Sequence, residues 1–398
     1  MSRSFPGFPK APPDGLLAAT MLAFLATAGL FYVNIMVALV AGLVDGLGLS
    51  EREAGLVASA NVYGASVGAL LAVLIVKRVP WRPIAVASLL LLVTLDALSI
   101  LVEAARALVA MRFVHGCVGG LLVGTAFAVI ARTRSPDRTF GMLLVVQFGL
   151  GGLGVMLLPR LVPVFGHAVL FLALMAFSLV TLLMVPFLDD YPPGRVQRAA
   201  GGSGRVEWGL LSFTLAAVFL FQASNMGLAA YLISLARHYG LETGYASTAI
   251  GVATWIAIVG PALVVAFGTR FGRTRPLAAG MVMTLVGTAA FHASGIAWVY
   301  LLANCLTGIT WAFVISYLLG MCAEFDQSGR TAALGGFVSK LGLASGPLAG
   351  AMLMDSHAYA TLINAAVVGL ALSVPAMLIP SAILDRRRAS RASGDLPP

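Results

Sequence analysis

Charged residues are scarce in this sequence. Asp, Glu, Lys and Arg together make up 10% of its 398 residues, whereas hydrophobic residues make up 60%. A water-soluble domain usually carries about 25% charged residues, so this chain has too little polar surface to cover a soluble protein of its length. The composition excludes an ordinary soluble fold and indicates a protein surrounded by lipid. The 44 glycines agree with this, because small residues let helices pack closely in a bilayer.

Cysteine is also rare, and enzyme motifs are lacking. Cys117, Cys305 and Cys322 lie in or beside hydrophobic segments and have neither metal-ligand spacing nor the pattern of a disulfide framework. The sequence contains no paired catalytic carboxylates, no Ser/His/Asp arrangement and no Walker phosphate loop. We therefore expect no catalytic residues, no metal, no cofactor and no ATP-driven pump. A membrane enzyme or scaffold is the alternative of another class, but the five histidines are scattered over separate segments.

Long hydrophobic runs are abundant instead. Each is near the twenty or so residues that a helix needs to cross the hydrocarbon core. Transmembrane helices are predicted at residues 17–43, 54–76, 84–103, 107–131, 140–162, 168–188, 208–234, 245–267, 276–294, 297–321, 332–354 and 359–383. The first run is too long for a signal-peptide core and is expected to be retained. The predicted fold class is an all-α membrane protein with twelve transmembrane helices in two six-helix bundles.

The basic residues predict the orientation in the membrane. They stand in short gaps between the hydrophobic runs, without the basic stripe interleaved with aromatics that nucleic-acid binding requires, so nucleic acid is excluded as a partner. With the N-terminus inside, nineteen Lys and Arg residues lie on the cytoplasmic side and four on the outer side. The positive-inside rule then predicts a multi-pass protein of the inner (cytoplasmic) membrane with both termini cytoplasmic.

The chain also repeats itself. Arg112 and Gly116 correspond to Asn304 and Gly308, and Gly48 corresponds to Gly240, all at an offset of 192. A constant offset over several positions indicates two halves in parallel order. The predicted domains are a cytoplasmic tail at 1–14, an N-terminal six-helix bundle at 15–188, a cytoplasmic linker at 189–207, a C-terminal six-helix bundle at 208–384 and a cytoplasmic tail at 385–398.

Three motifs resemble those of a known family. The stretches Val76–Pro83 and Gly268–Pro276 resemble Gly-x-x-x-Asp-Arg-x-Gly-Arg-Lys/Arg, the basic loop of the major facilitator superfamily of secondary transporters. Arg112–Gly119 is similar to the Arg-x-x-x-Gly-x-x-Gly pattern of that family. The glycines of residues 149–154 and 342–350 resemble its antiporter motif, although the first copy lacks the proline. Packing of helices through small residues is the simpler explanation of these glycines.

The resemblance covers about residues 15–384 and implies alternating access by a monomer in the lipid bilayer. It implies a small-molecule substrate, with protons or a counter-anion as coupling partners. It also implies gating loops, whose residues here are Arg78, Arg82, Arg270 and Arg273. Lys77 and Thr269 stand where the family has its gating aspartate, so the inner gate is expected to differ.

Ionisable residues inside the predicted helices are the candidate site. A charge at the bilayer centre costs about 3 kcal/mol, so it needs a partner or a wet cavity. Lys340 lies ten residues beyond Arg330, about 15 Å into the membrane, on a helix that lines the central cavity in the resembled family. Lys340 and Arg112 are therefore predicted to bind substrate, with Asn34, Gln147, Gln222, Asn225 and Trp311 as neutral contacts.

Asp96 and His115 are the candidates for proton coupling. Three simpler explanations stay open: Arg112 reaches the outer interface, Arg112 pairs with Asp96, or His115 only packs. The leading functional hypothesis is transport of a small organic anion between the two cations. The alternative is efflux of drugs or amphipathic compounds by proton antiport, although no acid lies in the first, fourth, seventh or tenth predicted helix.

Overall fold

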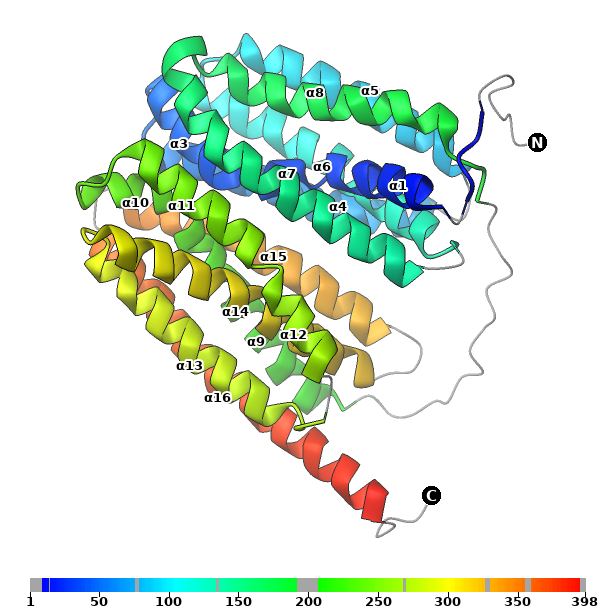
Figure 1. Cartoon of the computed structure of the whole chain (residues 1–398), viewed down its shortest axis with the longest axis vertical. Coiled ribbons are helices and arrows are strands. Elements are labelled where there is room, and N and C mark those ends of the chain that lie inside the picture. Colours follow the sequence, from blue (N-terminus) through cyan, green and yellow to red (C-terminus); the bar gives the residue numbers. More distant parts are fainter. Residues whose placement is uncertain are drawn as a thin grey trace.

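The computed structural model describes residues 9–13, 15–75, 79–133, 136–191, 207–267, 270–325, 330–354 and 359–393. Within these ranges the chain is almost entirely helical. The first half contains α1 (Leu16–Ala28), α2 (Phe31–Asn34), α3 (Met36–Leu47), α4 (Glu51–Ile75), α5 (Trp81–Ile100), α6 (Ala105–Ile130), α7 (Pro136–Phe165), α8 (Ala168–Met184) and the short η1 (Val185–Phe187). Figure 1 shows these helices as one bundle.

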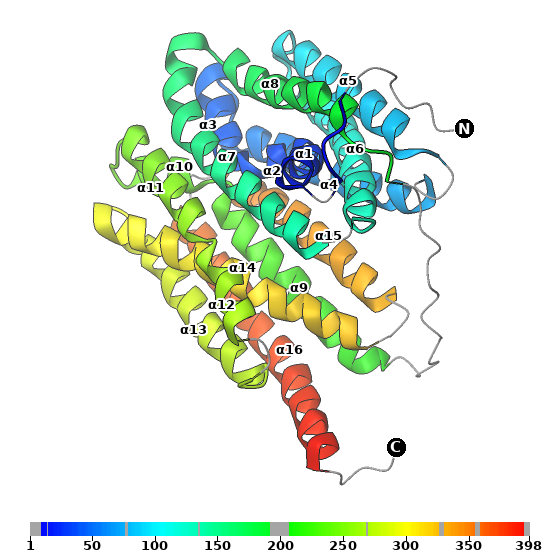
Figure 2. The same cartoon turned by 45° about the vertical axis from the view of Figure 1, so that its right-hand side comes forward.

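The second half forms another bundle beside the first (Figure 2). It contains α9 (Trp208–Ala229), α10 (Leu232–His238), α11 (Thr243–Ile256), α12 (Val259–Phe267), α13 (Thr274–Ala290), η2 (Phe291–Ala293), α14 (Ala297–Glu324), α15 (Arg330–Leu353) and α16 (Tyr359–Ser393). We call the end of the molecule where α1 and α9 begin the terminal end, and the end where α3 and α10 finish the far end.

Ten helical segments among the described residues are long and apolar enough to cross a membrane. The other two crossings are irregular, as their sequences explain. The first is broken into α1, α2 and α3, and the eleventh, α15, has its hydropathy lowered by Lys340, two serines and several glycines. With these two, the predicted twelve crossings in two bundles are confirmed. The seventh and eighth crossings are also broken, between α9 and α10 and between α11 and α12.

Helix α16 continues to Ser393, although its hydrophobic run was predicted to end at residue 383. Hydropathy marks the part of a helix that lies in lipid and not its end, and the arginines after Leu384 extend α16 beyond that part. Residues 385–393 of the predicted C-terminal tail are therefore helical. Most of the predicted linker at 189–207 and of the tail at 1–14 lies outside the described residues.

Glycines hold α4 and α6 in close contact. A side chain added at Gly64 would collide with the carbonyl oxygen of Phe113, and one added at Gly116 would collide with that of Asn61. Small residues permit such backbone contact, and dispersion contacts supply much of the association energy between helices in lipid. The glycine of the Arg-x-x-x-Gly pattern thus serves helix packing within the first bundle.

Candidate functional site

A cavity of about 260 Å³ lies between the two bundles. Four of the predicted contact residues line it: Asn34 at the end of α2, Gln147 on α7, Asn225 on α9 and Trp311 on α14. Its remaining lining is mostly hydrophobic and aromatic, and includes Val33, Phe148, Met226, Leu228, Leu232, Ile250, Phe291 and Leu343. None of the lining residues is ionisable. A site of this kind favours a ligand with a large apolar surface and a few hydrogen-bonding groups.

Gln222 stands behind the cavity wall and is only 2% exposed. Trp311 donates its indole N–H to Oε1 of Gln222 at 2.7 Å, and Gln222 donates from Nε2 to the Ser339 hydroxyl at 2.8 Å. Both ends of the amide are thereby satisfied, as burial requires. Gln222 therefore fixes the ring of Trp311 at the cavity wall, and the structure gives it a positioning contact.

Five polar lining residues were not among the predicted contacts: Ser224, Thr254, Thr288, Asn304 and Thr307. Each of them is a polar residue within a hydrophobic run, so each could have been recognised as a candidate in the sequence. The repeat offered a further signal for Asn304, because it occupies the position that Arg112 has in the first half. The two halves therefore use this helical position differently, for a cavity amide in one and a buried cation in the other.

Lys340 lies on α15, one helical turn toward the terminal end from Leu343, which lines the cavity. The side chain is half-buried. Within the described residues, no carboxylate forms an ion pair with its ammonium group and no hydrogen bond to it is found. The adjacent Ser339 is already bound to Gln222. Lys340 is not among the residues that line the cavity, and its ammonium has no ion-pair partner in the part of the chain that the structure describes.

Arg112 is fully buried inside the first bundle and does not line the cavity. Its Nη1 donates to Oδ1 of Asp96 at 2.7 Å, and its Nη2 donates to the Leu95 carbonyl at 3.2 Å and to the Ser99 hydroxyl. The ring of Phe171 lies 5.1 Å below the guanidinium carbon. The pairing of Arg112 with Asp96 is therefore present, and a fully buried Arg112 reaches neither the outer interface nor the substrate cavity.

His115 and Asn61 complete this buried cluster. Asn61 Nδ2 donates one proton to the Arg112 carbonyl at 3.2 Å, which identifies this atom as nitrogen, and lies 2.8 Å from Nδ1 of His115. Because an amide nitrogen only donates, Nδ1 of His115 accepts and its proton sits on Nε2. That Nε2 lies 3.3 Å from Oδ1 of Asp96. The hydrogen bonds therefore hold His115 neutral, and Arg112 and Asp96 balance each other.

Polar contacts between the two bundles begin at the far end. Arg237 on α10 bonds Asp45 on α3 at 2.5 Å, and Tyr359 on α16 donates to Glu51 on α4. Arg160 at the end of α7 donates to the Gly244 carbonyl at 2.9 Å. These contacts come from both bundles and close the molecule over the cavity at the far end.

Further contacts between the bundles lie deeper along the helices, and one of them is the hydroxyl of Ser59 on α4, which donates to the Ala344 carbonyl on α15. Tyr63 on α4 bonds the hydroxyl of Ser345 on α15 at 2.7 Å, and Trp255 on α11 donates to the carbonyl of Gly149 on α7 at 3.1 Å. A Cβ added at Gly152 would lie 2.8 Å from Cδ1 of Trp255 and 3.0 Å from the Gly251 carbonyl oxygen. The glycine-rich stretch of α7 therefore permits a close crossing with α11, and thus closure of one bundle on the other.

At the terminal end, the described polar contacts stay within each bundle. Arg82 of the first basic loop bonds Asp190 at 2.5 Å and the Leu188 carbonyl. Arg273 of the second loop donates from Nη2 to Glu324 at 2.8 Å. Of the other predicted gating residues, Arg270 is exposed and Arg78 lies outside the described residues.

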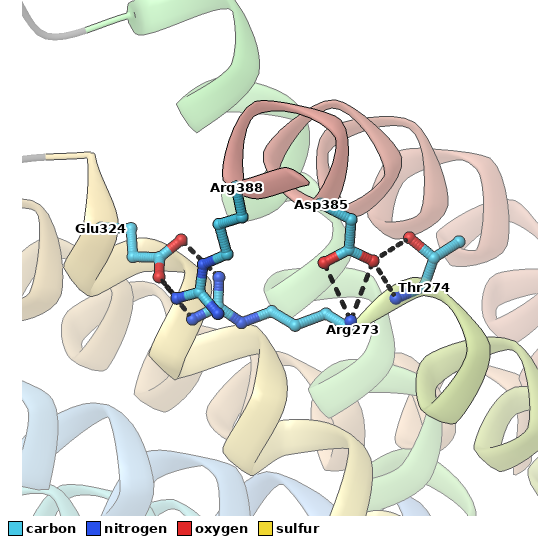
Figure 3. Close-up of polar contacts among 5 residues, drawn as sticks. All are labelled: Arg273, Thr274, Glu324, Asp385 and Arg388. Atoms are coloured by element: carbon cyan, nitrogen blue, oxygen red, sulfur yellow. Dashed lines mark hydrogen bonds and ion pairs between the residues drawn. The ribbon is translucent and has the colours of Figure 1, made fainter. Parts of the chain in front are cut away.

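Asp385 supplies a carboxylate next to the second basic loop. It accepts from the backbone N–H of Arg273 at 2.9 Å and of Thr274 at 2.9 Å, and so caps the start of α13, while Arg388 joins Arg273 on Glu324 (Figure 3). A carboxylate at a helix N-terminus satisfies free N–H groups and complements the helix dipole. Asp190 and Asp385 were not predicted, although each follows the last hydrophobic run of its half.

The fold and the cavity define a multi-pass membrane protein with a central site between two bundles. The model of the Major Facilitator Superfamily matches residues 16–347, and the chain belongs to this family of transporters. It is 25% identical over 346 residues to the multidrug resistance protein MdtL of Klebsiella pneumoniae (strain 342), covering 82% of this chain and 83% of that protein.

Solved transporters share the fold. The nucleoside transporter NupG superposes with a TM-score of 0.69 at 14% identity, over 91% of this chain and 99% of that chain. The human organic anion transporter MFSD10 (TETRAN) superposes with a TM-score of 0.65 at 17% identity, over 94% of this chain and 100% of that chain. At these identities the similarity establishes the architecture alone.

Proposed function

We propose that this transporter moves amphipathic organic compounds out of the cell by alternating access. The observation that carries the proposal is the cavity itself, whose lining is hydrophobic and aromatic with neutral amides and hydroxyls such as Asn34, Gln147 and Asn225. A ligand with a broad apolar surface fits such a wall, and the amides orient its polar group. The similarity to a protein named for multidrug resistance supports the same substrate class.

The state of the molecule supports export from the terminal side. Contacts such as Arg237–Asp45 close the far end, while the polar contacts described at the terminal end remain within each bundle. The excess of basic residues near the terminal end supports a cytoplasmic location for that end. In this proposal the protein is a monomer of the inner membrane, its termini are cytoplasmic, and the structure represents the state that loads substrate from the cytoplasmic side.

Efflux assays test this proposal directly. Cells that lack their own pumps are expected to gain resistance to amphipathic compounds when they express the chain, and Trp311→Ala is expected to remove most of that resistance. Trp298→Ala is the matched control, because Trp298 is 64% exposed outside the cavity. Equal resistance of the wild type and Trp311→Ala to every compound, or resistance in neither, would refute the proposal. Flux of the same compounds in proteoliposomes separates transport from indirect resistance.

A small organic anion is the second candidate substrate, and Lys340 is the observation that favours it. Its ammonium lacks a carboxylate partner in the described structure and stands one turn from the cavity residue Leu343. An anion would relieve the burial of this charge. With Lys340→Gln, uptake of an anion should fall at least tenfold while flux of a neutral amphipathic compound stays within twofold. Unchanged anion flux in Lys340→Gln would exclude this candidate.

Proton coupling is proposed for the cluster around Asp96 and His115. A proton can add to His115 only at Nδ1, where the amide of Asn61 now donates, so protonation must displace Asn61. Asn61 lies on α4, which also carries the cross-bundle residue Tyr63. Displacement of Asn61 would thereby link the proton to the closure of the bundles. In a pH-jump assay, Asp96→Asn and His115→Gln should both abolish acceleration by a proton gradient, and a normal response in both would disprove the link.

A further inference from the structure

A second cavity, of about 370 Å³, opens on the side of the second bundle near the terminal end. It is a groove between α12, α13 and α14, and we call it the lateral groove. Its walls are Leu263 and Phe267 of α12, Phe271 before α13, Pro276, Ala279, Gly280 and Met283 of α13, and Ile309 and Phe313 of α14. The remaining lining residues are Thr310, whose hydroxyl donates to the Thr307 carbonyl at 3.3 Å, and Arg275. Apart from Arg275, the groove is therefore apolar.

The break between α11 and α12 and the glycines along these helices form the groove. Gly260 brings the start of α12 against α14, where an added Cβ would lie 3.1 Å from both Ala312 and Phe313. Beyond that contact, Phe267 and Phe271 are 39% and 58% exposed. They line the slot between α12 and α13 together with the small residues Ala279 and Gly280 of α13.

The two exposed arginines of the second basic loop differ from the buried one. Arg273 is buried and bound to Glu324. Arg270 and Arg275 are exposed, and within the described chain neither side chain has an ion-pair partner. Asp385 already occupies the free N–H groups at the start of α13. Arg275 therefore supplies the positive charge of the groove lining, and the exposed Arg270 stands five residues before it in the chain.

The dimensions of the lateral groove match one leaflet of a bilayer. Arg275 and Met283 are eight residues apart on α13, which corresponds to about 12 Å at 1.5 Å per residue. One leaflet contributes about 15 Å of hydrocarbon. An acyl chain would lie along the groove while its headgroup phosphate meets the guanidinium of Arg275, which is a favoured partner of phosphate.

We propose that the lateral groove is a specific binding site for an anionic phospholipid of the leaflet at the terminal end. Charge complementarity selects the occupant: Arg275 lines the groove without a carboxylate partner in the described chain, and this charge favours a headgroup of net negative charge over a zwitterionic one. The site is independent of the central cavity and of the identity of the transported compound. It requires only that the chain is embedded in lipid.

Native mass spectrometry of the purified protein tests the site with phosphatidylglycerol and with phosphatidylcholine of the same acyl chains. The wild type should bind one phosphatidylglycerol molecule in a saturable manner. Arg275→Gln should weaken that binding about fivefold, the usual contribution of one basic residue, and Arg275→Lys should restore most of it. Ala279→Trp should fill the slot and weaken both lipids.

Matched controls come from the same molecule. Val282→Trp adds the same bulk to α13 at a 60% exposed position outside the groove, and Arg138→Gln removes an exposed charge from the start of α7. Both should bind phosphatidylglycerol like the wild type. If Ala279→Trp does not fold, Ala279→Leu tests the slot and Arg275→Gln tests the charge.

Three results would overturn the proposal. The first is wild-type binding in both Arg275→Gln and Ala279→Leu, and the second is equal weakening by the two controls. The third is displacement of the bound phosphatidylglycerol by a transported amphipathic compound, which would make the groove a substrate entrance. Because the first two results concern lipid binding alone, they do not depend on whether the chain exports such compounds.

Discussion

Replacing Gly152 by alanine should shift the transporter away from the state described above. Gly152 on α7 faces Trp255 and Gly251 on α11, which belongs to the other bundle. An added Cβ would lie 2.8 Å from Cδ1 of Trp255 and 3.0 Å from the Gly251 carbonyl oxygen, whereas ordinary contact between nonbonded carbon atoms begins at about 3.5 Å. One bundle must therefore move by about 0.5–1 Å relative to the other, or Trp255 must leave its place.

The expected size of the shift follows from this overlap. Overpacking a tight contact costs about 1–3 kcal/mol. The prediction takes α7 and α11 to separate when the far end opens, so that the penalty falls on the far-closed state alone. A difference of about 1–3 kcal/mol changes the ratio of far-closed to far-open molecules by roughly 5- to 150-fold. The gain in helix propensity from glycine to alanine, about 1 kcal/mol, applies to all states alike.

Distances between spin labels at the far end provide the assay. Val164 at the end of α7 and Trp298 at the start of α14 are 71% and 64% exposed and belong to different bundles, so labels there report opening. Gly152→Ala should increase the population with the long distance. The control is Gly149→Ala on the same helix, where an added Cβ meets nothing within 4 Å. If the two variants give the same distance distribution, the crossing of α7 and α11 does not govern closure.

Three further predictions concern other contacts. Asp96→Leu should destabilise the protein by about 3–5 kcal/mol, because it leaves the buried guanidinium of Arg112 unpaired. In a thermal melt in detergent, the double variant Asp96→Leu/Arg112→Met should recover most of the lost stability, and no loss in the single variant would contradict the pairing. Asp45→Ala should open the far end in the same direction as Gly152→Ala but by no more than about 1 kcal/mol, because Asp45 and Arg237 are both partly exposed, and the same label pair measures it. Trp311→Phe should keep the apolar wall but leave Oε1 of Gln222 without its donor. The affinity for an amphipathic ligand, measured by fluorescence titration, should therefore fall several-fold, and it should fall further than in the control variant Phe148→Leu.

The sequence was a good guide to the fold because hydrophobic length is a strong signal in a membrane protein. It could also point to Asn34, Gln147, Asn225 and Trp311, since polar and aromatic residues in long apolar runs are few. It could not show that Arg112 and Lys340, the two cations inside the predicted helices, have different surroundings. Arg112 has a carboxylate within reach on the neighbouring helix, in Asp96, whereas Lys340 has none in the described structure. That difference depends on which helix faces meet, and a hydropathy pattern does not specify them.

The loop aspartates illustrate another limit. The basic loops of the two halves lack the family aspartate, and sequence reasoning about that position alone predicted an altered gate. In the structure Asp385, over a hundred residues later in the chain, caps the start of α13 instead. A helix cap can come from any segment that lies nearby in space. The sequence at the motif position therefore does not show whether another residue supplies the cap.

The breaks in the helices have a consequence for how this protein moves. Three broken crossings reach the central cavity at their interruptions, with Asn34 at the end of α2, Ala229 before the break between α9 and α10, and Ala257 between α11 and α12. At each interruption the helix can bend with little loss of backbone hydrogen bonding. In the proposed export of amphipathic compounds, the wall around a bound compound would therefore tighten by bending of short segments such as α10 and α12 before the bundles rotate. One scaffold would then close over compounds of different size.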